Sequence, residues 1–283
     1  MLVSSLLAMI SRGGGTLTEL AIEGGREQAR ETQKGLAATS PPRRRHPSFS
    51  SNQPPPQTKP FSTPHKKNKN NQIYVPSHPL SKHWLAVARN KLSPPPVFRS
   101  ALAELGRILL YEAVDGWLPT VEGRVETPTG VADCTFVDPT EPVVVVPILR
   151  AGLVLLEAAA TLLPASRTYH VGYARDEATL EASAYLNKLP ARLSPDDRVL
   201  VVDVMLATGG TVVQVVEDLV ARGASDANIR VVAAVCAPPA LQALGERFGR
   251  LRVYAGMIDA ELDARGYIVP GLGDAGDRAF GTE

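Results

Sequence analysis

The sequence predicts an α/β protein with a parallel sheet flanked by helices. Three apolar runs rich in β-branched residues, at 143–146, 199–202 and 229–236, have the length expected of strands buried on both faces. Helical patterns of apolar residues alternate with these runs. Strands that alternate with helices pair in parallel, because each helix returns the chain to the same end of the sheet.

The first half of the folded sequence begins near Ile73. A run of prolines followed by apolar residues at helical spacing predicts a first helix, whose apolar face holds Leu102, Leu105, Leu109 and Ala113. Residues 120–137 alternate between apolar and polar side chains, which predicts one or two strands. The strand at 143–146 leads into a strongly apolar helix over 153–163.

The second half repeats the strand and helix pattern. Residues 168–173 predict a strand, and a polar segment follows at 174–190. The strand at 199–202 precedes an amphipathic helix whose apolar residues are Val212, Val213, Val215, Val216 and Leu219. The remaining expected elements are a strand at 229–236, a helix at 239–248 and a strand at 251–257.

Residues 1–71 differ in composition from the rest of the chain. They carry 11 Lys and Arg against 4 Asp and Glu, whereas the remainder carries 19 against 25. The segment is rich in Pro, Ser and Gln and cannot bury enough apolar surface to fold. We interpret it as a transit peptide, with a plain disordered extension as the alternative.

The two cysteines, Cys134 and Cys236, lie in apolar stretches and predict ordinary buried thiols. Two lone cysteines give neither a disulfide framework nor a metal-binding pattern. No apolar run has the length needed to span a membrane.

The segment from Asp203 to Thr211 has the features of an anion site. It follows a buried strand, contains Gly209 and Gly210, and begins an amphipathic helix. Glycines let a ligand approach the backbone, and the first N–H groups of the helix point at it. Asp203 should end the strand and accept hydrogen bonds from ribose hydroxyls, so the loop predicts a ribose 5-phosphate site. The alternative is an ordinary turn with a threonine cap.

Arg150 and Arg175 each follow the end of an expected strand. Ligands of parallel sheets bind beyond the carboxyl ends of the strands, so we expect both arginines near Asp203. Two guanidinium groups beside a phosphate loop suit a pyrophosphate, and Ala151 and Gly152 leave room for it. The alternative for each arginine is a surface ion pair.

The C-terminal run from Gly271 to Gly276 fits the dinucleotide pattern G-x-G-x-x-G. We expect no helix after it, and the chain ends seven residues later, so no βαβ unit can follow. No P-loop motif occurs in the chain. A glycine-rich loop can instead read the edge of a heterocycle with backbone groups.

Four motifs together resemble uracil phosphoribosyltransferase: PILRAG at 147–152, RDE at 175–177, DVMLATGGT at 203–211 and GYIVPGLGDAGDR at 266–278. The resemblance covers residues 72–283 and implies a type I phosphoribosyltransferase-like sheet with a small hood or flap. It implies that uracil and 5-phospho-α-D-ribose 1-diphosphate are converted to UMP and diphosphate in pyrimidine salvage. Mg²⁺ would be carried by the diphosphate substrate, with no metal site of the protein.

The resemblance also implies a role for each motif residue. Asp203, Arg150, Arg175 and Asp274 would be the catalytic residues. The residues that bind the phosphoribosyl diphosphate would be Arg150, Arg175, Asp203, Val204, Met205, Leu206, Ala207, Thr208, Gly209, Gly210, Thr211 and Asp274. Uracil would be read, largely through backbone groups, by Ile268, Gly273, Asp274 and Ala275.

Val204 departs from the family, which usually has proline at this position. Valine can donate a backbone N–H and is freer in φ, so the loop could differ in rigidity and turnover. The polar residues 176–190, which include Tyr185, Asn187 and Lys188, would form a closing flap.

The resemblance further implies a homo-dimer or a higher homo-oligomer. GTP activation occurs in some members, and nothing in this sequence decides it. The leader and the plant-like run at 72–80 favour a plastid location, with the cytoplasm as the alternative.

Three other functions stay open. A phosphoribosyltransferase for another base conflicts with the motif at 266–278. An RNA-binding regulator conflicts with the excess of acidic residues after residue 71, because RNA binders need a basic face. A catalytically silent family member is supported by Val204 alone.

Overall fold

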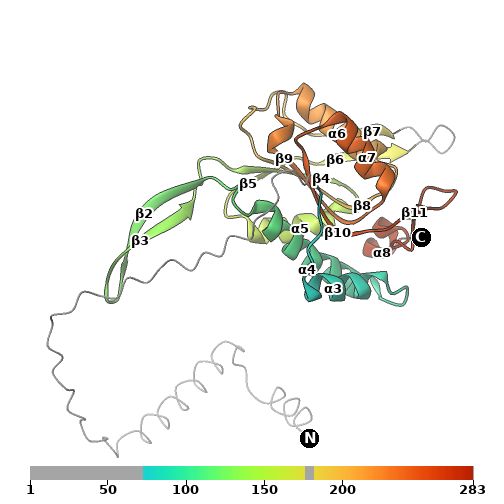
Figure 1. Ribbon diagram of the computed structural model, residues 1–283, viewed down its shortest axis with the longest axis horizontal. Coiled ribbons are helices and arrows are strands. Elements are labelled where there is room, and N and C mark those ends of the chain that lie inside the picture. The colour runs from blue at the N-terminus through green and yellow to red at the C-terminus, as the bar shows by residue number, and fades with distance from the viewer. Residues whose placement is uncertain (1–72, 176–181, 283) are drawn as a thin grey trace, which may run out of the picture. The chain divides into compact units, whose positions relative to one another are not determined.

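The computed structural model describes residues 73–175 and 182–282 (Figure 1). An eight-stranded sheet forms its centre, in the order β1-β10-β9-β8-β4-β6-β7, with β5 beside β4. Every pair in this sheet is parallel except β6 with β7. The strands are β1 (Ile73–Tyr74), β4 (Val143–Leu149), β5 (Ser166–Thr168), β6 (Val171–Arg175), β7 (Ala182–Asn187), β8 (Val199–Leu206), β9 (Ile229–Cys236) and β10 (Arg252–Ile258).

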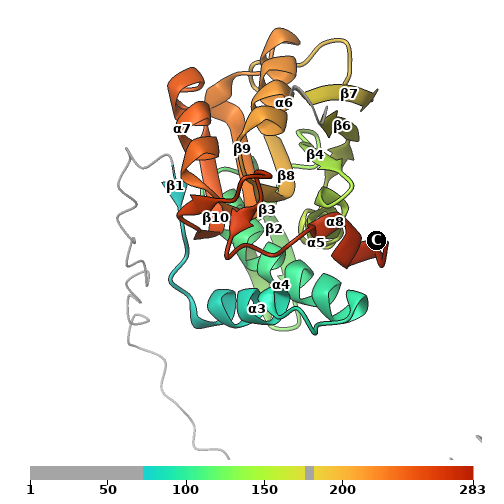
Figure 2. The ribbon, with the colours of Figure 1, turned by 90° about the vertical axis from the view of Figure 1, so that its right-hand side faces the viewer.

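Helices cover both faces of the sheet, as Figure 2 shows. One face carries α3 (Pro79–Arg89), α4 (Pro95–Val114) and α5 (Gly152–Leu162), and the other carries α6 (Gly210–Ala221) and α7 (Pro238–Arg247). Successive side chains of a strand point to opposite faces of the sheet. Val143 and Val145 pack on the face of α4 and α5, and Val144 and Val146 pack on the face of α6 and α7. The expected α/β class and both helical layers are therefore confirmed.

The central strand β8 is longer than its apolar run suggests. Backbone pairing with β9 continues past Val202, through Asp203 with Ala233 and Leu206 with Cys236. The expectation that Asp203 ends the strand is therefore wrong, because the partner strand extends the pairing to Leu206. Asp203 lies inside the strand, three residues before its end.

The strand expected at 168–173 is divided in two. β5 pairs with the first half of β4, and β6 pairs with Ile148 and Leu149 at its end. Part of the expected flap is the strand β7, which runs antiparallel to β6. Residues 176–181 of that flap lie outside the described residues.

Two helices were missed from the sequence. Helix α3 begins at Pro79, with the imidazole of His78 accepting a hydrogen bond from the N–H of Leu80 at 3.2 Å. Helix α8 (Ala275–Phe280) follows the C-terminal glycine-rich run, so the expectation of no helix there is wrong. The carboxylate of Asp274 accepts the N–H of Asp277 at 2.9 Å and begins this helix.

Two small sheets lie beside the central one. β2 (Thr120–Thr127) and β3 (Gly130–Val137) form a hairpin that extends away from the central sheet in Figure 1, and β11 (Glu261–Leu262) pairs with β12 (Ile268–Val269). Cys134 of β3 is half-buried, because an isolated hairpin cannot enclose its side chains, whereas Cys236 is buried as expected. Within residues 73–175 and 182–282, none of the helices combines the length and apolarity needed to cross a bilayer.

Candidate functional site

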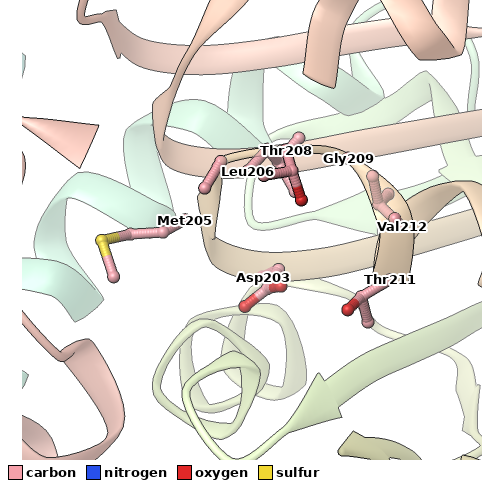
Figure 3. Close-up of a pocket in the computed structure, with 9 residues that line it drawn as sticks. Asp203, Met205, Leu206, Thr208, Gly209, Thr211 and Val212 are labelled. Atoms are coloured by element: carbon pink, nitrogen blue, oxygen red, sulfur yellow. The ribbon is translucent and has the colours of Figure 1, made fainter. Parts of the chain in front are cut away.

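The loop between β8 and α6 encloses a pocket at the carboxyl end of the sheet (Figure 3). The pocket has a volume of about 160 Å³. It is lined by Asp203, Met205, Leu206, Ala207, Thr208, Gly209, Gly210, Thr211 and Val212. Eight of these nine residues are among the predicted ligands of the phosphoribosyl group, whereas Arg150, Val204 and Asp274 of that predicted set do not line the pocket.

Polar groups of the loop and the start of α6 surround this pocket. Figure 3 places the hydroxyl of Thr208 toward the space that the loop encloses, and the hydroxyl of Thr211 on the same side as the carboxylate of Asp203. Helix α6 begins at Gly210, so its first N–H groups have no partner within the helix. The helix dipole adds partial positive charge at this end. The loop therefore has the donors that a phosphate requires.

Gly209 fixes the path of the loop. Its φ is +90°, and a Cβ atom there would lie 2.9 Å from the Cα atom of Ala240 in α7. A side chain at Gly209 would therefore be strained in conformation and too close to α7. Gly210 differs, because a Cβ atom on it would meet nothing within 4 Å.

Asp203 is half-buried at the base of the pocket. Burial raises the pKa of its carboxylate to about 7, although hydrogen bonds from the backbone N–H groups of Val204 and Met205 act in the opposite direction. The Asp203 Oδ1 to Val204 N distance is 2.7 Å. A strong acceptor is thus held at the pocket, beside the loop between β8 and α6.

Val204 donates a hydrogen bond to this carboxylate and packs in the core. Its side chain is fully buried, and its N–H is taken up by Asp203. A proline at this position would have no N–H to donate, so the departure from the family adds one hydrogen bond to Asp203. Among the other predicted ligands, Leu206 is buried, and Met205 points away from the loop in Figure 3.

Arg150 follows β4 at the same end of the sheet, beside β8. Its guanidinium donates to Asp277 Oδ1 at 2.8 Å and to Thr282 Oγ1 at 3.1 Å. The expectation that Gly152 leaves room for a ligand is wrong: a Cβ atom there would lie 2.5 Å from the carbonyl oxygen of Val202. Gly152 instead lets the start of α5 pack against β8.

Arg175 is the last residue of β6, and its backbone pairs with Ala182 of β7. Its side chain lies outside the described residues, so its place in the site stays a prediction. The base of this hairpin is attached to α6, because Tyr173 Oη and Asn187 Nδ2 each donate to Asp218 Oδ2 at 2.8 Å. Burial, together with this hydrogen bond, raises the pKa of Tyr173.

The predicted base-reading residues lie close together on the C-terminal loop. Ile268 is a buried residue of β12, Gly273 has a φ of +72°, Asp274 begins α8, and Ala275 is buried at its first turn. The ion pair between Arg150 and Asp277 joins this loop to the end of β4. The predicted diphosphate residue Arg150 and the predicted base-reading loop are therefore joined through α8.

Sequence reasoning missed the partners of Arg150. Asp277 stands one helical turn after Asp274, a spacing that could have suggested a shared site. Asp277 has its pKa lowered by the hydrogen bonds from Thr282 and Arg150.

Among residues 73–175 and 182–282, no group of three or more His, Cys, Asp or Glu side chains is arranged to hold a metal ion.

Comparison with known proteins agrees with this geometry. A family model described as uracil phosphoribosyltransferase matches residues 75–282. The uracil phosphoribosyltransferase of Nicotiana tabacum is 55% identical over 210 residues, which cover 74% of this chain and 94% of that protein. The chloroplastic uracil phosphoribosyltransferase of Arabidopsis thaliana is 56% identical over 211 residues, 75% of this chain and 71% of that protein.

A solved structure has the same fold. The AQ2163 protein from Aquifex aeolicus is 36% identical and superposes with a TM-score of 0.67. The match covers 74% of this chain and 97% of that one.

The first prediction concerns the two loop glycines of the ligand-free protein. Gly209→Ala should lower the free energy of unfolding by about 2–4 kcal/mol, because the left-handed conformation alone costs about 1–2 kcal/mol and contact with α7 adds to it. Gly210→Ala is the matched control and should be neutral or stabilising, since alanine favours a helix. Urea unfolding measures both, and equal losses in the two variants would contradict the account.

The second prediction concerns Asp203. Its folded-state pKa is raised, so its carboxylate destabilises the fold increasingly as pH rises from about 4 to 7. Asp203→Asn should therefore be more stable than the parent at pH 8, with an advantage about 2 kcal/mol larger than at pH 5.

Urea unfolding at the two pH values tests this prediction. Asp138→Asn is the control: it should lose the same stability at pH 5 and at pH 8, because hydrogen bonds from the hydroxyl and N–H of Thr140 lower the pKa of Asp138 and its carboxylate is ionised at both pH values. A pH-independent difference for Asp203→Asn would refute the assignment.

Proposed function

This chain belongs to the uracil phosphoribosyltransferase family, and we propose that it transfers a phosphoribosyl group to uracil in pyrimidine salvage. Uracil and 5-phospho-α-D-ribose 1-diphosphate give UMP and diphosphate. The observation that carries the proposal is the pocket from Asp203 to Val212, at the start of α6 and at the carboxyl end of a parallel sheet. Such a position suits a ribose 5-phosphate.

The phosphoribosyl group would bind along the loop between β8 and α6. Backbone N–H groups of Gly209 and Gly210 and the hydroxyls of Thr208 and Thr211 would hold the 5-phosphate. Asp203, in its ionised form, would accept hydrogen bonds from the ribose hydroxyls. Val204, Met205, Leu206 and Ala207 would contribute mainly by fixing the backbone, because two of their side chains are buried and Met205 points away.

Arg150 and Arg175 would hold the diphosphate with paired hydrogen bonds. Arg150 follows β4, the strand next to β8, and pairs with Asp277 in the ligand-free protein. Diphosphate would therefore have to replace Asp277 as its partner. The hairpin of β6 and β7 would form the hood that carries Arg175.

Uracil would lie against Ile268, Gly273, Asp274 and Ala275. Backbone groups of this loop would pair with the edge of the base, and Asp274 would also face the phosphoribosyl side. Transfer breaks the bond from ribose C1 to the diphosphate oxygen and forms a bond from C1 to uracil N1, while the N1 proton passes to the departing diphosphate or to water. Positive charge develops on the sugar and negative charge on the leaving group, which the two arginines would stabilise.

Mg²⁺ suits this site as a companion of the substrate. Mg²⁺ keeps several waters and needs only one or two carboxylates besides phosphate oxygens. The ion would be carried by the diphosphate, and Asp203 is the one acidic residue among the nine that line the pocket. When bound with the diphosphate, the ion would neutralise part of its charge.

We further propose a homo-oligomer, which the hairpin of β2 and β3 supports. Val121, Val131 and Phe136 are exposed on it, Val131 by 72%. Residues 72–283 would form the enzyme domain. Residues 1–71 would be a plastid transit peptide, in keeping with the chloroplastic relative.

The test of the activity is UMP formation from labelled uracil, 5-phosphoribosyl 1-diphosphate and Mg²⁺ by the full chain. We expect turnover with uracil and at least about 100-fold less with cytosine or hypoxanthine, because a mismatched edge leaves buried polar groups unpaired. Parallel reactions without Mg²⁺ and with added GTP test the metal and the activator. Tight substrate binding without turnover would favour the silent member, and Val204→Pro would then be assayed for recovery.

The ion pair between Arg150 and Asp277 gives a further prediction. Asp277→Asn removes the carboxylate that competes with diphosphate, so the Kd for diphosphate should fall about threefold to tenfold. Calorimetric titration with magnesium diphosphate measures this change. The matched control is Asp197→Asn, because Asp197 forms a similarly exposed ion pair with Arg167. The side chains of Asp197 and Arg167 are 20% and 46% exposed, and those of Asp277 and Arg150 are 24% and 51% exposed. A weaker diphosphate affinity in Asp277→Asn would mean that Asp277 holds Arg150 in its binding position.

A further inference from the structure

The C-terminal loop doubles back on itself at Gly271. Its φ is +55°, and a Cβ atom there would lie 2.0 Å from the carbonyl oxygen of Ile268. Gly271 thus stands between Ile268 and Gly273, two of the residues assigned to the base. Where Gly271 is held determines where the backbone groups on both sides of it point.

A single ion pair binds both backbone polar groups of Gly271. Asp259 Oδ2 accepts its N–H at 3.0 Å, and Arg89 Nη1 donates to its carbonyl oxygen at 3.1 Å. Arg89 and Asp259 are joined to each other by two further hydrogen bonds, of 2.7 and 2.8 Å. The four hydrogen bonds leave the glycine peptide groups little freedom to move.

The environment makes this arrangement rigid. The carboxylate of Asp259 is only 6% exposed, and the N–H of Asp259 donates to the carbonyl of Cys236 at the end of β9. Arg89 is the last residue of α3. The glycine is therefore fixed between the end of the sheet and the end of a helix that lies about 180 residues earlier in the chain.

A second arginine holds the other side of the loop. Arg278 donates to the carbonyl oxygens of Leu272, Ala88 and Asn90, each at 2.7 Å, and its guanidinium lies 4.2 Å from the ring centre of Phe98. The C-terminal end of α3 thus contacts the loop through both arginines.

Stability alone does not account for the pair of Arg89 and Asp259. Apolar residues of similar size often stabilise a fold as well as a buried ion pair does. An ion pair differs in that its hydrogen bonds fix the direction of the groups it binds. Backbone groups that read a base must be held to within about 0.5 Å, so a directional support is what this loop requires.

We propose that Arg89 and Asp259 are positioning residues that set the backbone of residues 271–273 and thereby the preference for uracil over other pyrimidine bases. This inference rests on the proposed function of the loop. Neither residue is among those assigned to the base. Loss of either one lets Gly271 move, which weakens the hydrogen bonds to uracil and leaves the phosphoribosyl pocket unchanged.

Asp259→Asn in the full chain is the primary test. Steady-state kinetics should show a KM for uracil raised about tenfold, as expected when one or two hydrogen bonds of about 1 kcal/mol are lost. The KM for 5-phosphoribosyl 1-diphosphate should stay within about twofold. The ratio of kcat/KM for uracil to that for cytosine should fall about tenfold, because a looser loop no longer penalises the wrong edge.

Asp226→Asn is the matched control. Asp226 is 17% exposed, pairs with Arg250 at 2.6 Å and also accepts the backbone N–H of Arg250 at 3.2 Å. It stands at the amino ends of β9 and β10, opposite the site. This control should leave both KM values and the base preference unchanged.

Arg89→Lys provides an independent variant if Asp259→Asn fails to fold. Lysine keeps the charge but cannot make the paired hydrogen bonds, so it should raise the KM for uracil selectively as well. Parallel changes in both KM values, or an unaltered base preference in folded variants, would overturn the inference while the parent enzyme still uses uracil. A parent enzyme with no uracil turnover would instead refute the proposed function, and this inference with it.

Discussion

The site depends on the close approach of backbone segments at the carboxyl end of the sheet. Gly152 brings the start of α5 against the carbonyl of Val202, and Gly209 brings the loop between β8 and α6 against Ala240 of α7. Because neither residue has a side chain, the start of α5 packs directly on β8 and the start of α6 packs directly on α7. Arg150 follows β4 and Asp203 lies in β8, and these two strands are neighbours in the sheet.

The C-terminal loop depends on a different kind of force. Its residues contribute few strands or helices, so charged groups take the place of regular backbone pairing. Arg89, Asp259 and Arg278 supply hydrogen bonds to loop carbonyls and N–H groups that would otherwise lack partners. Loops of this kind can be precise when their backbone groups are held by a rigid surrounding structure.

Much of the fold could be predicted from the sequence, because its strands are buried on both faces and so appear as apolar runs. The runs at 143–146, 199–202 and 229–236 each became a central strand. The extension of β8 to Leu206 could not be predicted, since it depends on its register with β9. Helix α8 was missed because six residues give too short a pattern to recognise.

The candidate site was predictable only where a local motif exists. The loop from Asp203 to Thr211 is contiguous, and the structure closes it around one pocket. The support of Gly271 joins Arg89 to residues about 170 and 182 positions away, and no local pattern reveals such contacts.

The ligand-free site combines two electrostatic states that substrate binding would change together. Burial raises the pKa of Asp203 to about 7, so hydrogen-bond donors from a ligand would stabilise its ionised form. Arg150 has its charge satisfied by Asp277. A substrate with ribose hydroxyls and a diphosphate supplies donors to the first and a stronger acceptor to the second. Each exchange removes an unfavourable or competing interaction of the free protein. Asp277 belongs to α8, the helix that follows the loop assigned to the base, so the ion pair with Arg150 joins that helix to the end of β4.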